Sequence, residues 1–220
     1  MRREKFAVLG LGVFGSTIAT NLAKHGFDVI AIDLDETCVE RVAPFCDAVQ
    51  ADFTDIDQIR ELGIEDVDCA VIATGSYLEQ SILGVMNLQE FGVPYIFAKA
   101  KNGKYKKVLE KLGVHKVIRP EKEMGERVAK LLETPNLNNI IDLDENTMVA
   151  DLIPPQEWLN KSIVELNLRY HYEVNVIGIK RNGSNKLNVL IQPNTVIHEG
   201  DTLVLICTQE SLSKISVQTK

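Results

Sequence analysis

Three glycines near the start of the chain have the spacing of a phosphate-binding loop. Gly10, Gly12 and Gly15 directly follow an apolar run and open an amphipathic stretch. The first glycine permits a tight turn, the second lets a pyrophosphate approach the backbone, and the third lets helix and strand pack closely. Asp33 then stands where a carboxylate accepts hydrogen bonds from ribose hydroxyls and repels the 2′-phosphate of NADP. The alternative is a simple turn with Asp33 capping the next helix, but two signals in register favour nucleotide binding.

Further candidate contacts follow two later apolar runs. Asp52 and Thr54 come after the third run, and Thr74 and Gly75 come after the fourth. Open α/β sheets bind ligands at the carboxyl ends of their strands, so these residues are expected near the adenosine half of a nucleotide. Capping of the following helix explains Asp52 and Thr54 equally well.

Catalytic chemistry is not visible in the sequence. The four histidines are dispersed, and the chain has no Gly-x-Ser-x-Gly, His-Glu-x-x-His or phosphate-loop lysine pattern. Tyr95 and Lys99 match the Tyr-x-x-x-Lys spacing of short-chain dehydrogenases. That pair works on a helix, whereas residues four apart on a strand lie roughly 13 Å apart. The sequence therefore predicts a binding protein rather than an enzyme, with an NAD-dependent oxidoreductase or an NADH-sensing regulator as alternatives.

Composition limits the class of protein. The chain has 220 residues and a formal net charge of −7, which argues against nucleic-acid binding. Its apolar runs are far shorter than the about 20 residues of a membrane span. The four cysteines lack the spacing of a zinc site or a disulfide framework. These features predict a soluble, cytoplasmic protein.

The order of the expected elements predicts an α/β fold with a Rossmann-like doubly wound parallel sheet, followed by a small α+β domain. Nearly continuous apolar runs at 6–9, 28–32, 48–50, 69–73, 94–98 and 116–118 are typical of buried parallel strands. Helical periodicity lies between them at 14–25, 36–43, 55–62, 76–90 and 104–112, and again at 121–133. Beyond these, strands are expected at 148–153, 174–180, 187–191 and 202–207, with a short helix at 162–168. We therefore expect domains at 1–133 and 141–220, joined by a linker at 134–140.

Taken together, these segments resemble a known family. Residues 6–15, 31–33, 51–55, 62–64, 71–75, 98–100, 108–113 and 120–125 are similar to the nucleotide-binding half of the regulatory subunits of Trk and Ktr potassium-uptake systems. Residues 162–169 and 200–204 resemble the C-terminal domain of these subunits, which belong to the RCK class (regulator of potassium conductance). The resemblance covers nearly the whole chain, keeps the motif order, and is closest to the Ktr-type ring subunit.

The resemblance implies a mode of action. Such subunits form homodimers that assemble into an octameric ring beneath a membrane potassium-translocating subunit. They are cytoplasmic and peripheral to the inner face of the cell membrane through that partner. ATP and ADP compete for the glycine loop, and the exchange changes the shape of the ring and gates the channel without catalysis.

Site residues are carried over by position. Asp33 would take the ribose, and Asp52 with Thr54 would flank the adenine. Glu121 would lie near the terminal phosphate, through Mg²⁺ or another divalent cation, or else be an ordinary first-turn acid of its helix. The expected nucleotide contacts are Gly10, Gly12, Val13, Phe14, Gly15, Asp33, Leu34, Asp52, Phe53, Thr54, Ala73, Thr74, Gly75, Lys99 and Glu121.

Val13 departs from the family pattern, which often has an arginine there to reach the terminal phosphates. Valine has no such reach, so ADP and NAD or NADH become candidates beside ATP. Lys99 or Arg119 would be the compensating cation.

A second small-molecule site is implied in the C-terminal domain, where similar subunits bind cyclic di-AMP. The matching positions here are Ile163, Asn167, Arg169, Tyr172 and Asn175. Arg169 would contact a phosphate, although a basic residue that ends a short helix needs no ligand, and Tyr172 is equally a packing residue.

Overall fold

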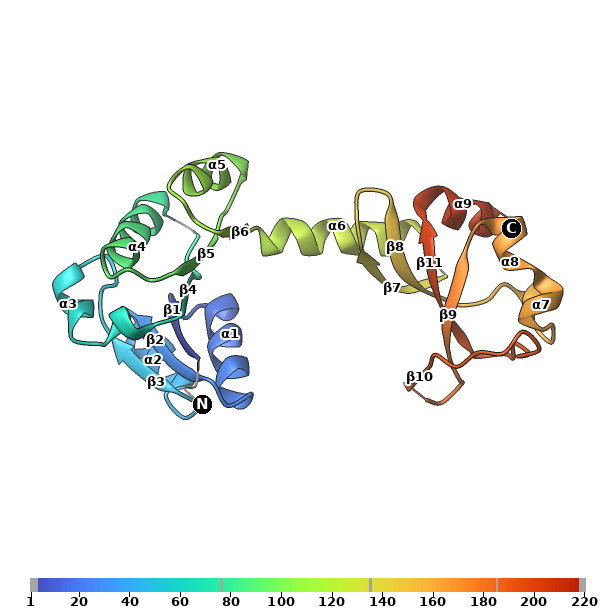
Figure 1. The fold of residues 1–220 in the computed structure, drawn as a ribbon, viewed down its shortest axis with the longest axis horizontal. Helices are drawn as coiled ribbons and strands as arrows, with labels where there is room; N and C mark the ends of the chain where they lie inside the picture. Colours follow the sequence, from blue (N-terminus) through green and yellow to red (C-terminus); the bar gives the residue numbers. More distant parts are fainter. Residues whose placement is uncertain (1–3, 76, 135, 185, 218–220) are drawn as a thin grey trace. The chain divides into compact units, whose positions relative to one another are not determined.

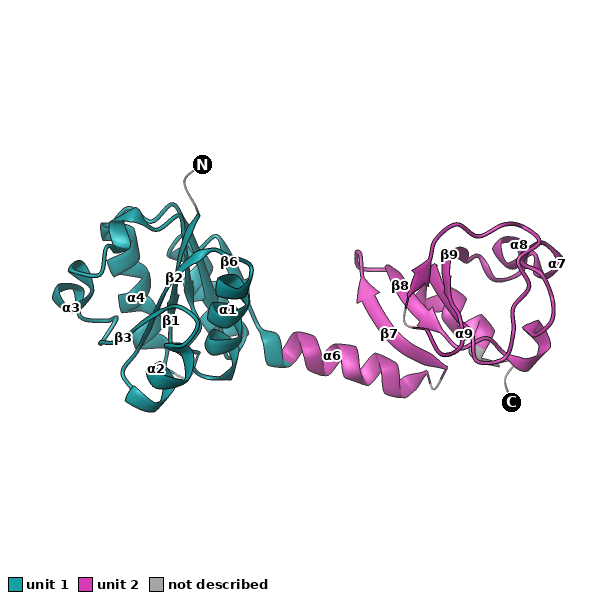
Figure 2. Ribbon diagram, turned by 90° about the horizontal axis from the view of Figure 1, so that it is seen from below, with its two compact units in different colours: residues 1–121 teal, residues 122–220 magenta. Residues whose placement is uncertain are grey.

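The computed structural model describes residues 4–75, 77–134, 136–184 and 186–217. The chain folds as two compact units, residues 1–121 and 122–220, which are coloured separately in Figure 2. No helix in the described ranges combines the length and apolar character needed to cross a bilayer.

The first unit contains a six-stranded parallel sheet in the order β3-β2-β1-β4-β5-β6 (Figure 1). Its strands are β1 (Lys5–Leu9), β2 (Asp28–Asp33), β3 (Asp47–Gln50), β4 (Cys69–Ile72), β5 (Tyr95–Lys99) and β6 (Lys116–Ile118). The connecting helices are α1 (Val13–Lys24), α2 (Glu36–Val42), α3 (Ile56–Arg60), the short turn η1 (Ile64–Asp66), α4 (Leu78–Glu90) and α5 (Gly103–Lys111). The predicted doubly wound fold is confirmed.

Both faces of this sheet are covered, which explains the nearly continuous apolar strands. Val8 and Ala31 pack with α1 and α2 on one face. Leu9 and Ile32 pack with residues of α3, α4 and α5 on the other. The strand order reverses between β1 and β4, and a doubly wound sheet opens its ligand crevice at such a point.

The second unit is built on an antiparallel sheet in the order β10-β9-β11-β8-β7. Helix α6 (Pro120–Glu133) begins in the first unit and continues into the second. The other elements are β7 (Leu137–Asp142), β8 (Thr147–Leu152), η2 (Gln156–Trp158), α7 (Ile163–Leu166), α8 (Leu168–Tyr172), β9 (Asn175–Lys180), β10 (Leu187–Asn188), β11 (Thr202–Thr208) and α9 (Gln209–Val217). The core around the fully buried Trp158 is separate from that of the first unit.

Three expectations about elements need correction. The linker expected at 134–140 is strand β7 from Leu137 onward, because Leu137 and Ile140 are buried and the segment pairs with β8. Pro135 lies outside the described residues. The strand expected at 187–191 is reduced to Leu187–Asn188, which pairs with the end of β9. The helix expected at 76–90 begins at Leu78, and Ser76 lies outside the described residues.

Candidate functional site

The glycine loop joins β1 to α1, and two of its glycines are required by the packing. Gly10 has a φ of 92°, and its amide donates to the Ile32 carbonyl over 2.8 Å. A Cβ on Gly15 would lie 1.9 Å from the Gly10 carbonyl oxygen, so only glycine fits there. A Cβ on Gly12 would meet no protein atom within 4 Å. Gly12 therefore faces open space, where a ligand can approach the backbone.

The first turn of α1 is available to an anion. Gly12 occupies the N-cap position without a side-chain hydrogen bond, and the first turn contains no acidic residue. The first amide groups of a helix lack partners within the helix and carry the positive end of its dipole. The Val13 side chain is 82% exposed and leaves the approach open, whereas Phe14 is half-buried.

Asp33 at the end of β2 has a structural role in the loop. Its Oδ2 accepts a hydrogen bond from the Leu11 amide, and its Oδ1 accepts one from the Asp35 amide over 2.9 Å. A carboxylate has about four acceptor positions, so two are still available for ribose hydroxyls. Asp33 thus fixes the loop while keeping the capacity expected of a ribose ligand. Leu34 follows it with an exposed side chain.

Asp52, Phe53 and Thr54 form a tight turn after β3. The Asp52 Oδ1 accepts from the amide and the hydroxyl of Thr54, at 2.9 and 2.6 Å. Helix α3 is capped instead by Asp55, which accepts from the Asp57 amide. Asp52 therefore does not cap α3, so the helix-capping alternative for this residue is wrong. Phe53 is buried in the core, so its side chain supports the turn from beneath.

One contact that supports this turn has no signal in the sequence. The Asn87 side chain on α4 donates to the carbonyls of Phe53 and Thr54 at 3.1 and 3.0 Å. An asparagine in the middle of a helix gives no local indication of such a distant partner.

Lys99 is the cation of the site. Its Nζ forms an ion pair with the Glu121 carboxylate and lies 5.8 Å from the centre of the Phe14 ring. Its side chain is only 18% exposed, whereas that of Glu121 is 68% exposed. The hydrogen bond from Lys99 lowers the pKa of Glu121. The structure thus brings Lys99 to the first turn of α1 and to the first turn of α6.

The residues that follow β4 complete this edge of the sheet. The Ala73 amide donates to the Leu9 carbonyl over 2.8 Å. The Thr74 amide lies 3.1 Å from the position of a Cβ on Gly10, so the two loops are in close contact. The stem of Lys99 lies 3.3 Å from the position of a Cβ on Gly75. Glycine at position 75 therefore gives Lys99 room beside the loop.

The residues present do not form a metal site by themselves. No group of three or more potential ligand side chains converges within the described ranges. Glu121 is a single carboxylate already paired with Lys99, so a divalent ion would need most of its ligands from a bound nucleotide.

The Tyr95–Lys99 pair lies on a strand, as expected. The two residues occupy opposite ends of β5, and the Tyr95 ring contacts His115 at 5.2 Å between centroids. The geometry of a dehydrogenase helix is absent.

The second unit contains a cavity of about 570 Å³ at the expected second site. Ile163, Asn167, Arg169 and Asn175 all line it, and the Arg169 Nε donates to the Asn175 Oδ1 over 2.8 Å. Tyr172 packs against Trp158, with ring centroids 5.1 Å apart, and is not part of the lining. The remaining lining is apolar and was not among the expected ligand contacts: Val164, Leu168, Val174, Val176, Ile177 and Ile206.

Together, the doubly wound sheet, the open glycine loop and the small antiparallel domain define a protein with a Rossmann-like nucleotide-binding fold followed by a small antiparallel domain. The TrkA-N domain model matches residues 6–120, and the TrkA-C domain model matches residues 148–217. The chain belongs to the TrkA family, and proteins similar to it are named as potassium uptake proteins of Ktr and Trk systems. The family resemblance noted in the sequence is confirmed.

The chain is similar to relatives along its whole length. It is 34% identical to the Ktr system potassium uptake protein A of Bacillus subtilis (strain 168), covering 97% of this chain and 96% of the relative. The solved GsuK RCK domain has a TM-score of 0.68 at 18% identity, covering 98% of this chain and 47% of that one. A structure of the GsuK channel bound to NAD has a TM-score of 0.64 at 17% identity, covering 100% of this chain and 40% of that one. This chain thus spans less than half the length of these two solved chains, and the likeness to them concerns the fold alone.

Proposed function

We propose that this chain is the cytosolic regulatory subunit of a membrane potassium-uptake system and that an adenine nucleotide at the glycine loop sets its conformation. The observation that carries the proposal is the uncapped, unobstructed first turn of α1, with Asp33 bound to the Leu11 amide before it and Lys99 beside the Phe14 ring. Similarity along the whole length to a potassium uptake protein supports the partner class. The subunit binds its membrane partner from the cytoplasmic side and performs no catalysis.

ATP and ADP are the proposed ligands. Asp33 binds the ribose and disfavours a 2′-phosphate by charge repulsion, while Asp52 and Thr54 border the adenine side. Lys99 binds the terminal phosphate in place of the arginine that valine replaces at position 13. A phosphate there competes with Glu121 for the Lys99 ammonium, so the first turn of α6 responds to the length of the phosphate chain. Mg²⁺, held mostly by the nucleotide, would offset the charge repulsion between the Glu121 carboxylate and the phosphate.

The regulatory step is a population shift. The chain has two conformations, and each nucleotide binds them with different affinity. Each nucleotide therefore shifts the equilibrium by the difference between its binding free energies for the two conformations. Because α6 leaves the nucleotide-binding unit directly after Glu121, its first turn is the part of the chain that we expect to respond.

Assembly with further copies is also proposed. Helix α6 has no buried residue, and its exposed Met124, Val128 and Leu132 are each four residues apart, on one face. Such an unpartnered apolar stripe is typical of a helix that packs against a second copy. We propose a homodimer that assembles into an octameric ring, and native mass spectrometry of the purified protein tests both states.

A second ligand, cyclic di-AMP, is proposed for the cavity in the second unit. Arg169 would contact a phosphate, Asn167 and Asn175 offer polar atoms, and Ile163 lies against the ligand. Tyr172 is left out of this set because it packs on Trp158.

Thermal unfolding with ATP, ADP, NADH and NADPH, each with and without Mg²⁺, tests the proposal, because a ligand that binds the folded state raises the melting temperature. ATP and ADP are expected to stabilise the protein and NADPH to have no effect. Lys99→Met should weaken ATP binding more than NADH binding, because it removes the cation at the terminal phosphate. A response to NADH alone would favour the oxidoreductase or NADH-sensing alternative, and substrate turnover with NADH would separate those two.

A flux assay tests the partner. The purified chain is added to liposomes that contain the membrane potassium-translocating subunit of a Ktr system. Potassium flux should differ between ATP and ADP when the chain is present. Flux that is unchanged by the chain and by both nucleotides would reject the regulatory role, even if nucleotides bind.

A further inference from the structure

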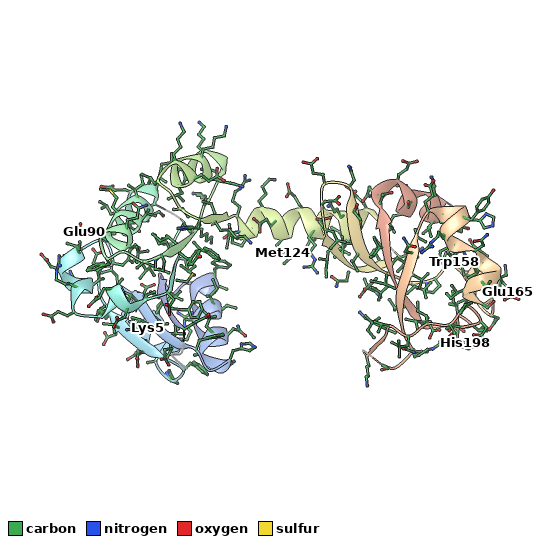
Figure 3. All side chains as sticks on the ribbon, in the orientation of Figure 1. Lys5, Glu90, Met124, Trp158, Glu165 and His198 are labelled. Atoms are coloured by element: carbon green, nitrogen blue, oxygen red, sulfur yellow. The ribbon has the colours of Figure 1, made fainter. Side chains whose placement is uncertain are left out.

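Helix α5 has two chemically distinct faces. Leu109 is fully buried, and Tyr105 and Leu112 pack against the same core beneath the helix. Lys104, Lys107 and Lys111 follow the i, i+3, i+7 spacing that places residues on one helix face, and all three are exposed. At 100° per residue they fall within an arc of about 60°. Figure 3 shows nitrogen-tipped side chains projecting away from the sheet along α5.

This lysine face is positive in a negatively charged protein. Lys101, just before the helix, is also exposed, and none of the four lysines has an ion-pair partner in the part of the chain that the structure describes. Lys106 lies to the side and pairs with Glu110 over 3.6 Å. The whole chain has a net charge of −7, so a local concentration of unpaired lysines is not a consequence of overall composition.

The lysine face lacks the features of a protein-binding surface. Protein interfaces are organised around buried aromatic or apolar anchors and are depleted in lysine. Leu109 is buried, Tyr105 packs against the core, and Val108, four residues from Lys104, is half-buried. No exposed apolar anchor therefore stands among Lys104, Lys107 and Lys111. Lysine is also a flexible point charge and lacks the rigid donor fork that arginine offers to a fixed carboxylate. A surface of mobile anionic headgroups needs neither an anchor nor fixed geometry.

We propose that the lysine face of α5, formed by Lys101, Lys104, Lys107 and Lys111, binds the anionic headgroups of a lipid bilayer. This contact is independent of the nucleotide, and only its cellular setting rests on the proposed membrane partner. Lysines near an anionic membrane surface each strengthen binding about fivefold, and the effect is screened within a Debye length. Removal of three lysines should therefore weaken binding about a hundredfold.

Vesicle flotation of the 220-residue chain tests the proposal. Vesicles of phosphatidylglycerol mixed with phosphatidylcholine are compared with vesicles of phosphatidylcholine alone. The test variant is K104Q/K107Q/K111Q. The matched control is K24Q/K161Q/K186Q, which removes the same charge from exposed positions elsewhere. The melting temperature with and without ATP is recorded for each variant, so that a failure of folding or of nucleotide binding is seen separately.

The wild-type protein and the control should float with anionic vesicles at low salt, and both should be released by high salt. The test variant should remain unbound. Equal flotation of the two triple variants would overturn the proposal, because net charge alone would then explain binding. A wild-type protein that ignores both kinds of vesicle but is retained on polyglutamate would also overturn it and would favour an acidic protein segment.

Discussion

Gly12→Ala should separate nucleotide binding from folding at the glycine loop. Gly12 has a φ of −59° and a ψ of −172°, which alanine adopts without strain. Its Cβ would meet no protein atom within 4 Å. The substitution should therefore leave the free energy of unfolding unchanged or raise it by about 0.5 kcal/mol, since alanine lowers the entropy of the unfolded chain.

The same methyl group would occupy the space through which a phosphate approaches the loop. Loss of two charge-assisted hydrogen bonds, each worth about 1.5 kcal/mol or more, weakens affinity roughly a hundredfold. A ligand at a hundred times its Kd stabilises the folded state by about 2.7 kcal/mol, and the weakened complex by only about 0.4 kcal/mol. At about 4 °C per kcal/mol, the shift in Tm should fall from roughly 10 °C to roughly 2 °C.

Gly15→Ala is the matched contrast three residues away. Its Cβ would lie 1.9 Å from the Gly10 carbonyl oxygen and 2.9 Å from the Ala73 Cβ. Because the first of these atoms belongs to the backbone, relief requires α1 to move away from β1. The expected cost is about 3 kcal/mol of unfolding free energy, at the upper end of overpacking effects.

Differential scanning fluorimetry of both variants, with and without ATP, is the assay. Gly12→Ala should melt like the wild-type protein without ligand and lose most of the ATP shift. Gly15→Ala should melt well below the wild-type protein under all conditions. A full ATP shift in Gly12→Ala would refute binding at this loop, and normal stability of Gly15→Ala would refute the packing argument. Asp33→Ala is a poorer probe, because Asp33 also anchors the Leu11 amide.

Three further predictions concern titration and burial. Lys99 holds the pKa of Glu121 below its usual value. The stabilisation from this pair should be present above about pH 4.3 and be lost as pH falls through the lowered pKa. NMR titration should show the Glu121 pKa rising in Lys99→Met, and an unchanged value would contradict the ion pair. Asp201 is 2% exposed and accepts a hydrogen bond from Arg181 over 2.6 Å. Asp201→Ala should therefore lower the free energy of unfolding, measured by urea titration, by about 3 kcal/mol. A loss below about 1 kcal/mol would contradict a stabilising role for this buried ion pair. Burial raises the pKa of Cys207 to about 11, so maleimide at neutral pH should label Cys207 only after unfolding, whereas the other three cysteines are only partly buried. Peptide mapping locates the label, and labelling of Cys207 itself in the folded protein would contradict its burial.

The sequence determined the features that depend on local conformation and on apolar pattern. The loop at Gly10–Gly15 was predictable because a left-handed φ and a close helix contact admit only glycine at two of its positions. The parallel strands were predictable because burial on both faces leaves nearly continuous apolar runs. The family was recognisable from the same segments, since they occur along this chain in the order that is typical of the family.

The local pattern was least informative where pairing with distant residues decides the structure. The stretch Asn138–Asn139 has the composition of a linker but lies in β7, because Leu137 and Ile140 reach the core and β8 supplies the hydrogen bonds. β10 is shorter than its apolar run suggested, since only Leu187 and Asn188 find partners on β9.

The arrangement of the candidate sites was decided by tertiary structure alone. Lys99, Glu121 and Phe14 are far apart in sequence and meet because parallel strands end at one edge of the sheet. The packing of Tyr172 on Trp158 removed it from the cavity that Arg169 lines. Residue types and spacing indicated which side chains are suited to bind a ligand, whereas their mutual contacts depend on long-range packing that no local pattern encodes.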